Sequence, residues 1–150
     1  MISKENIKGA MQVELPIKIH GYDIDLMGIV NNIVYLRWFE HLRQEFLDRF
    51  WPLEDMLKEN QSPILHKTSL EYKKPLTIYE KPKGRLWLSS VKHARWVVDI
   101  EIEQNGEIYA AGQQSGFFFD MVNKRPVLLP KGLIKQFEDF HADKLKKQNS

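Results

Sequence analysis

The sequence predicts an α+β fold in which a curved antiparallel sheet wraps around one long central helix, with a further helix at the C-terminus. An apolar stripe of helical period runs through residues 31–50. Four strand-like segments fill residues 64–120, and the last carries a run of small side chains that would let a helix approach it closely. One helix packed on hairpin-connected strands is an α+β arrangement.

The N-terminal segment predicts an edge strand followed by a loop. Apolar residues alternate there with polar ones, at Val13, Leu15, Ile17 and Ile19. This period of two is typical of a strand with one buried face. Because Pro16 has no N–H to donate, we expect the strand at an edge or a bulge. Residues 20–30 contain two Gly, two Asp and no regular period, so they predict a loop.

The next twenty residues predict the central helix. Its apolar residues recur every four positions, at Val34, Trp38, Leu42 and Phe46. Either Asn31 or Asn32 is suited to the N-cap, and Pro52 ends the segment. So wide an apolar face predicts that the helix is buried against the sheet.

The sheet itself is expected from strands at residues 64–73, 84–92, 95–103 and 107–120. Asn105-Gly106 joins the last two strands and favours a type I′ turn, so these strands are antiparallel. The small side chains of the last strand are Ala110, Ala111, Gly112, Ser115 and Gly116. Residues 131–148 predict the terminal helix, whose last turns are rich in Lys.

Composition excludes several classes of function. The 150 residues include no Cys, which rules out disulfides, thiolate metal sites and cysteine nucleophiles. A formal net charge of +2 argues against binding to a nucleic-acid backbone. The sequence offers neither a signal-peptide core nor a stretch long enough to span a membrane. We therefore expect one cytoplasmic domain over residues 1–150, acting on a small molecule without a metal or cofactor.

Two acidic residues precede the helix in a pattern with chemical meaning. Asp23 and Asp25 lie just ahead of Gly28 and of the predicted helix N-terminus. The first N–H groups of a helix lack partners within it, so they can stabilise a developing oxyanion while a nearby carboxylate supplies a base or nucleophile. Asp is also common as an N-cap or turn residue. Gly28 indicates a positive φ or a close approach of substrate.

These residues resemble a family motif. The hotdog-fold acyl-CoA thioesterases, in the branch of 4-hydroxybenzoyl-CoA thioesterase and the YbgC-like enzymes, have an acid, a second Asp, a Gly and a polar helix start. The matching residues are Asp23, Asp25, Gly28, Val30, Asn31, Asn32, Tyr35, Glu40 and Arg43. The resemblance continues through residues 70–76 and 125–130 and covers about residues 11–135.

The resemblance implies hydrolysis of an acyl-CoA thioester to a free acid and CoA. Asp25 would be the nucleophile or general base, with Asn32 supplying an oxyanion-binding N–H and Gly28 completing the catalytic loop. It further implies a groove shared by two subunits, hence at least a homodimer, commonly assembled into a tetramer. The candidates for substrate binding are Asn31, Tyr35, Glu40 and Arg43. Glu40 and Arg43 are also spaced to form an ion pair on one helix face.

The sequence departs from the family at its histidines. Ile29 and Asn32 occupy positions where relatives carry His, and we expect His20 and His41 to be surface residues. Because these histidines are missing, one alternative is a hotdog module that binds an acyl thioester without hydrolysing it. A second alternative is the hydrolysis of acyl carrier protein thioesters. Hydration of enoyl-CoA needs an Asp and His pair in another motif, which the sequence lacks.

Coenzyme A carries phosphates, so a local basic cluster is expected despite the small net charge. The candidate clusters are Lys73-Lys74, the group Lys81, Lys83 and Arg85, and the group Lys92, His93 and Arg95. Charged turns are also often merely solvated.

Overall fold

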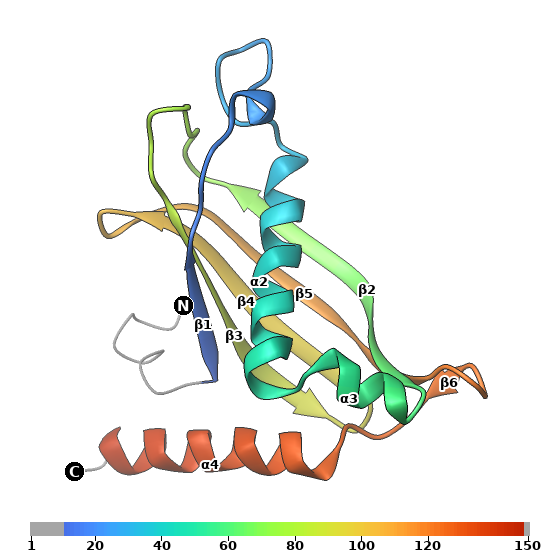
Figure 1. Cartoon of the computed structure of the whole chain (residues 1–150). Coiled ribbons are helices and arrows are strands. Elements are labelled where there is room, and N and C mark those ends of the chain that lie inside the picture. The colour runs from blue at the N-terminus through green and yellow to red at the C-terminus, as the bar shows by residue number, and fades with distance from the viewer. Residues whose placement is uncertain (1–10, 149–150) are drawn as a thin grey trace.

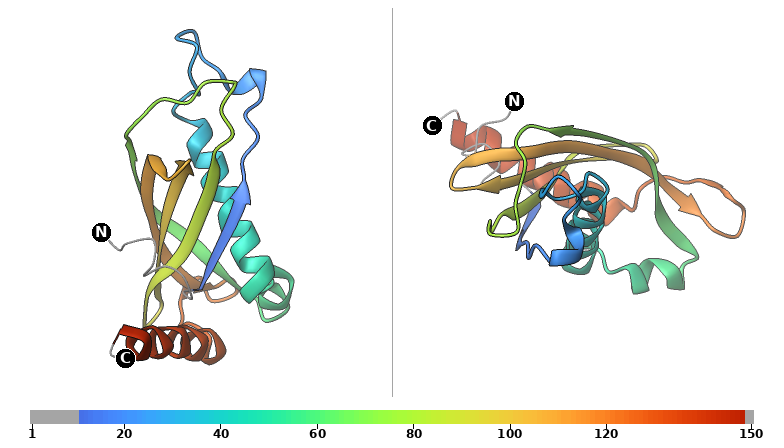
Figure 2. Two further views of the ribbon diagram at one scale, coloured as in Figure 1. Left: turned by 90° about the vertical axis from the view of Figure 1, so that its left-hand side faces the viewer. Right: turned by 90° about the horizontal axis from the view of Figure 1, so that it is seen from above.

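The computed structural model describes residues 11–148, which form an antiparallel sheet curved around one long helix (Figures 1 and 2). The elements follow the chain as β1 (Gln12–Pro16), a 3-10 turn (Gly21–Asp23), α2 (Val34–Phe50), α3 (Leu53–Lys58), β2 (Gln61–Tyr72), β3 (Lys83–Lys92), β4 (Arg95–Gln104), β5 (Glu107–Asp120), β6 (Arg125–Pro126) and α4 (Lys131–Gln148). The predicted architecture, including its C-terminal helix, is confirmed.

The strands lie in the order β1-β3-β4-β5-β2, and β6 pairs with β5 beside this path. Each of these pairs is antiparallel. Strands β1 and β2 therefore form the two edges of the sheet. The predicted edge position of the N-terminal strand is confirmed, but β1 ends at Pro16, short of the predicted alternation that runs to Ile19.

Helix α2 lies on one face of the sheet and forms the centre of the core. Its buried side chains are Val34, Tyr35, Trp38, Phe39, Leu42 and Phe46. Full burial of an aliphatic or aromatic side chain of this size contributes about 1.5–3 kcal/mol. Seen from above, the sheet curves around α2, and α4 crosses the end of the sheet that lies far from the start of α2 (Figure 2).

The small residues of β5 permit this close packing. A Cβ at Gly112 would lie 2.5 Å from Cε2 of Phe39 and 2.8 Å from the carbonyl oxygen of Ser69. Only a residue without a side chain lets α2 and β2 approach β5 so closely there. The predicted contact between the helix and the small-residue strand is confirmed.

The turn between β4 and β5 also follows the sequence. Asn105 has φ 53° and Gly106 has φ 80°. These positive values are those of a type I′ turn, as predicted for Asn-Gly. The hairpin fixes the register of β4 against β5, which lie side by side in the sheet.

The beginning of the central helix differs from the prediction. Helix α2 begins at Val34, its N-cap position is Ile33, and no side chain caps it, so the assignment of Asn31 or Asn32 as N-cap is wrong. The short elements α3 and β6 were not predicted, because six and two residues show no period. Among the helices of residues 11–148, none combines the length and apolarity needed to cross a bilayer.

Candidate active site

The loop that carries the acidic motif is a small hairpin at one end of α2 (top of Figure 1). Ile24 and Val30 form an antiparallel bridge. On either side of this bridge, the Asp25 N–H donates to the Ile29 carbonyl at 2.9 Å and the Asn31 N–H donates to the Asp23 carbonyl at 2.8 Å. The motif is therefore held by backbone hydrogen bonds rather than left as an irregular loop.

Gly28 closes the tip of this hairpin. Its φ is +78°, and its N–H donates to the Asp25 carbonyl at 3.0 Å. A Cβ at this position would meet nothing within 4 Å. Gly28 therefore serves the backbone conformation, which is the first of the two roles the sequence indicated.

Asp25 is only partly exposed, and its carboxylate takes part in the turn. Oδ1 accepts the Met27 N–H at 2.8 Å. Within residues 11–148 no other group donates a hydrogen bond to this carboxylate. The turn role that Asp commonly plays is thus present, and it leaves Oδ2 free to act on a substrate or on water.

Asn31 and Asn32 shape the turn that leads into α2. The Asn31 side chain accepts the Ile33 N–H at 3.1 Å, and the Asn31 carbonyl accepts the Val34 N–H at 3.0 Å. In a trans peptide the N–H points opposite to the C=O, so the N–H of Asn32 points away from the helix. No acceptor in the described residues takes this N–H, which makes it a candidate donor to a ligand oxygen.

Tyr72 fixes the same turn from the edge strand. Its hydroxyl donates to the carbonyl of Asn32 at 2.7 Å. Its ring meets the buried Tyr35 ring edge-on at 5.1 Å between centroids. Sequence reasoning gave Tyr72 no role, and only its place in the matched segment 70–76 could have indicated one.

Tyr35 lies beneath this turn rather than open to it. The side chain is 2% exposed, and burial raises the pKa of its hydroxyl to about 12, with Tyr72 and Glu80 adding to the shift. A buried aromatic ring in this position supports the helix start. The structure therefore gives Tyr35 a packing role and leaves its proposed contact with substrate as a prediction.

Asp23 is a structural residue. It is 4% exposed, and its Oδ2 accepts the His20 N–H at 2.9 Å. The His20 ring stacks on Tyr22 with centroids 4.8 Å apart. The two acids of the motif thus differ, because Asp23 is buried and stabilises the 3-10 turn, while Asp25 is partly exposed.

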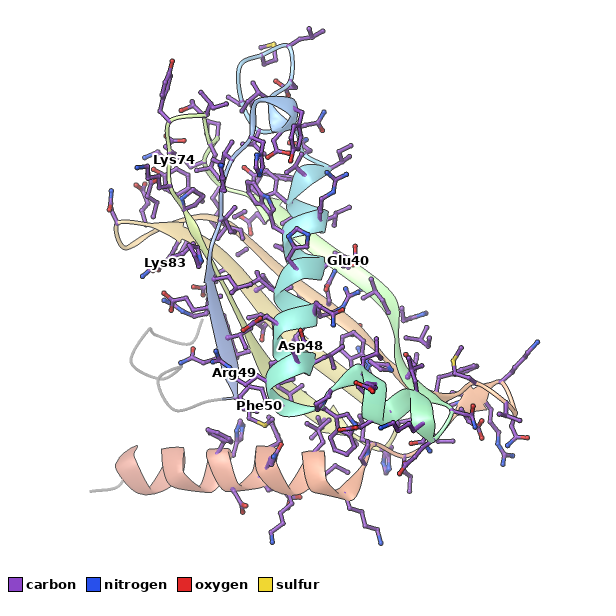
Figure 3. The ribbon with its side chains drawn as sticks, viewed as in Figure 1. Glu40, Asp48, Arg49, Phe50, Lys74 and Lys83 are labelled. Atoms are coloured by element: carbon purple, nitrogen blue, oxygen red, sulfur yellow. The ribbon has the colours of Figure 1, made fainter. Side chains whose placement is uncertain are left out.

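Glu40 and Arg43 lie farther along α2. Arg43 Nη1 donates to Oε1 of Gln114 at 2.7 Å, and Gln114 Nε2 donates to Oγ1 of Thr68 at 3.1 Å. Burial lowers the pKa of the Arg43 guanidinium. Glu40 is exposed midway along the helix (Figure 3), and Arg43 bonds to β5 instead of pairing with it. These two residues are not brought to the Asp25 hairpin of their own chain.

A cavity of about 250 Å³ opens beside Arg43, toward the end of α2 that lies far from Asp25. Its walls come from the C-terminal half of α2, from α3, from the start of β2 and from the inner face of the sheet. Most lining side chains are apolar, and they include Phe46, Met56, Trp96, Phe118 and Leu133. Sequence reasoning did not find this cavity, because it depends on the unpredicted helix α3.

Members of two of the basic clusters form ion pairs with carboxylates. Lys74 Nζ lies 3.0 Å from Oε2 of Glu107, and Lys83 Nζ lies 2.9 Å from Oε1 of Glu14 (Figure 3 labels both lysines). Arg85 also contacts Glu14, at 3.3 Å. In the described part of the chain, no three His, Asp or Glu side chains gather as a metal site.

Comparisons with known proteins find a matching family and two curated relatives. A model described as the thioesterase-like superfamily matches residues 19–137. The chloroplastic acyl-acyl carrier protein thioesterase ATL3 of Arabidopsis thaliana is 25% identical over 129 residues, which are 85% of this chain and 68% of that protein. The related ATL2 is 24% identical over 120 residues, and the match spans only 55% of its length.

Solved structures share the fold. A thioesterase from Thermus thermophilus, crystallised with coenzyme A and Zn, has a TM-score of 0.76 at 18% identity, covering 90% of this chain and 97% of that one. A DHNA-CoA thioesterase from Staphylococcus aureus has a TM-score of 0.71 at 24% identity, covering 92% and 91%. These likenesses confirm the hotdog fold.

Proposed function

The chain belongs to the thioesterase-like superfamily, and on that premise we propose that it hydrolyses an acyl-CoA thioester with Asp25 as the catalytic carboxylate. The observation that carries the proposal is the Asp25 hairpin. It holds a partly exposed carboxylate, with Oδ2 unengaged, next to a helix start whose Asn32 N–H has no acceptor in the described residues.

The chemistry follows from those two groups. As the thioester carbonyl carbon gains a bond to oxygen, negative charge grows on the carbonyl oxygen, and the Asn32 N–H stabilises it. In one route Asp25 takes a proton from the attacking water and the C–S bond then breaks to release the thiol. In the other route Asp25 attacks the carbonyl itself and the C–S bond breaks to expel the thiolate, and water then cleaves the resulting anhydride to the free acid and the Asp25 carboxylate.

A single turnover in oxygen-labelled water, combined with trapping of the intermediate, tests for the anhydride route. The label enters the Asp25 carboxylate only if an anhydride forms there and water attacks its aspartyl carbon, whereas attack on the acyl carbon labels the product acid in both routes. Mass spectrometry of the peptide that contains Asp25, together with trapping of the anhydride by hydroxylamine, reports which route operates.

The carrier of the acyl group is proposed to be coenzyme A. Solved structures of the same fold include the Thermus thermophilus complex with coenzyme A. The curated relatives from Arabidopsis thaliana are named as thioesterases of acyl-acyl carrier protein. Rates on coenzyme A and acyl carrier protein thioesters of one acyl chain decide between the two carriers.

The site is proposed to be shared between two copies of the chain. Strand β2 is an edge strand, yet Ile64, Leu65 and Tyr72 are each at least 40% exposed on it. Exposed apolar edges invite pairing with another strand. A two-fold axis pairs β2 with its own copy in antiparallel order, which covers this edge in both subunits.

Substitution of Asp25 tests the proposal. Asp25→Asn keeps an oxygen that accepts the Met27 N–H and removes only the charge, so the hairpin is preserved. We expect kcat to fall by about 10²–10⁴-fold, the usual contribution of a positioned base. Thiol release from aliphatic and aromatic acyl-CoAs is the measurement.

Asp48→Asn is the matched control, because Asp48 is exposed on α2 and bonds only to Gln44 in the described structure. It should retain wild-type turnover. Full activity in Asp25→Asn would contradict the proposal. Acyl-CoA binding without turnover in the wild type would identify a binding module instead.

A further inference from the structure

We propose that the cavity beside Arg43 holds the apolar tail of the acyl group, and that it serves the Asp25 of the partner subunit. The proposal rests on the proposed thioesterase function and names its substrate class, an unbranched aliphatic acyl chain of medium length. It further assigns Met56 of α3 as the residue that limits chain length.

The size and lining of the cavity argue for an aliphatic occupant. A dry cavity of about 150 Å³ lined by aliphatic and aromatic residues already binds benzene. The cavity described here has about 250 Å³, with side chains such as Phe46, Leu88 and Val98 on its walls. A hydroxylated aromatic acyl group would need hydrogen-bond partners at depth, whereas a hydrocarbon tail needs none.

Polar groups gather on one side of the cavity and indicate where the carrier end of the ligand lies. Glu40, Arg43, Gln44 and Ser62 line it there, on α2 and the start of β2. The hydrogen bond from Arg43 to the buried Gln114 holds the guanidinium against the sheet. The methylene groups of Arg43 then form part of the cavity wall, and the charged guanidinium does not enter the apolar interior.

The direction of β2 connects this cavity to the partner subunit. The Asp25 hairpin lies at the C-terminal end of β2, where Tyr72 bonds to Asn32. The cavity lies at the opposite end of β2, lined by Ser62, Pro63 and Leu65. When β2 pairs with its copy in antiparallel order, each Asp25 hairpin comes beside the cavity of the partner subunit.

Helix α3 closes the cavity and provides a matched pair of residues. Met56 is 4% exposed and lines the cavity, while its neighbour Leu57 is 51% exposed. A large side chain at the first position fills the cavity, and the same side chain at the second lies in solvent. The two substitutions therefore separate cavity volume from general effects on α3.

The chain-length profile is the first test. Rates are measured for straight-chain acyl-CoAs from butanoyl to tetradecanoyl. For Met56→Trp we expect kcat/KM to fall at least about tenfold for the longer chains, equivalent to about 1.4 kcal/mol, with butanoyl-CoA unaffected. Met56→Ala should move the optimum to longer chains, and Leu57→Trp should keep the wild-type profile. Unchanged profiles in both Met56 variants would overturn the proposal, and Met56→Ala decides alone if Met56→Trp does not fold.

A binding measurement separates this proposal from the catalytic one. Titration calorimetry with decanoate, which has no thioester, should give binding to the wild type and to Asp25→Asn but not to Met56→Trp. If this binding pattern is found but the protein hydrolyses no thioester, the proposed role of the cavity is supported and the proposed thioesterase function is contradicted. If hydrolysis depends on Asp25 but the Met56 variants change neither the chain-length profile nor decanoate binding, only the proposed role of the cavity is contradicted.

A hybrid dimer tests the sharing between subunits. One chain carries Asp25→Asn and a normal cavity, the other carries Met56→Trp and a normal Asp25, and two affinity tags isolate the mixed dimer. Its single intact Asp25 then works with the normal cavity of the other chain, so we expect the wild-type profile. The profile of Met56→Trp would show instead that each Asp25 uses the cavity of its own chain.

Discussion

The two oxygens of the Asp25 carboxylate have different surroundings. Oδ1 accepts the Met27 N–H, so it is fixed in the turn, and Oδ2 is the oxygen left for the proposed reaction. The side chain therefore cannot rotate freely, which lowers the cost of ordering it in the transition state. A longer Glu side chain would not keep both the turn and the position of the second oxygen.

Individual residues of the site were predictable where a backbone rule governs them. Gly28 was predicted because a positive φ favours glycine, and the structure has that φ. Tyr72 was not predicted, since its partner Asn32 is 40 residues away and the hydrogen bond depends on the folded sheet. The roles of Asn31, Tyr35, Glu40 and Arg43 toward a substrate stay predictions.

The buried Tyr35 hydroxyl predicts a pH dependence of stability. Its pKa is about 12 in the folded chain, raised mainly by burial, against about 10 in an unfolded chain. Between these values the folded state keeps a proton that the unfolded state has lost, so stability is full below about pH 10 and falls as pH rises through about 12. Tyr35→Phe should remove part of this decline.

Urea midpoints measured from about pH 8 to about pH 12 check this expectation. Tyr79→Phe is the control, because Tyr79 is 89% exposed and should leave the wild-type decline in place. Parallel plots of urea midpoint against pH for the wild type and Tyr35→Phe would contradict the assignment of the decline to the Tyr35 hydroxyl.

Strand β5 shows what the pattern of one secondary-structure element can and cannot predict. Its bounds and its small residues were predicted from the sequence, and Gly112 does receive the Phe39 ring. Helix α3 gave no signal, because six residues complete fewer than two turns. The start of α2 was misplaced, since Asn31 caps a preceding turn rather than the helix itself.

Gly116 predicts a sharp effect of one methyl group. A Cβ there would overlap the carbonyl oxygen of Ile64 and lie 2.5 Å from the Trp96 ring, so β2 and β5 would have to separate. We expect Gly116→Ala to lower the free energy of unfolding by about 1–3 kcal/mol.

Gly21→Ala is the matched control for Gly116→Ala. Its added Cβ would lie 3.9 Å from the nearest atom, Cδ1 of Ile78. It should change the free energy of unfolding by less than about 0.5 kcal/mol. Equal urea midpoints for the two variants would show that the strands tolerate the added methyl group.

The proposed assembly of the molecule is argued from the edges of its sheet. Of the two edge strands, β1 is short and ends in proline, while β2 has twelve residues and exposed apolar side chains. Such an edge is stable in solution when another strand covers it. The sequence predicted an edge position only for the N-terminal strand, through Pro16, and the folded sheet identifies β2 as the other edge.

Dilution tests the shared site. We expect light scattering at micromolar concentration to give a dimer or a larger assembly. Activity per chain should fall when the protein is diluted below the dissociation constant of the dimer, because separated chains lack half of each site. A monomer at micromolar concentration with constant activity per chain on dilution would contradict the arrangement.

The hydrogen bond from Tyr72 to Asn32 joins this edge to the reacting end of α2. Displacement of the edge strand would move the same turn whose Asn32 N–H we propose as the donor to the substrate carbonyl. Subunit pairing and substrate affinity are then linked quantities, and linkage is reciprocal. If dimer formation raises the affinity for the thioester by some factor, then bound thioester raises the affinity between the subunits by the same factor. The substrate would then favour the dimer that is proposed to hydrolyse it.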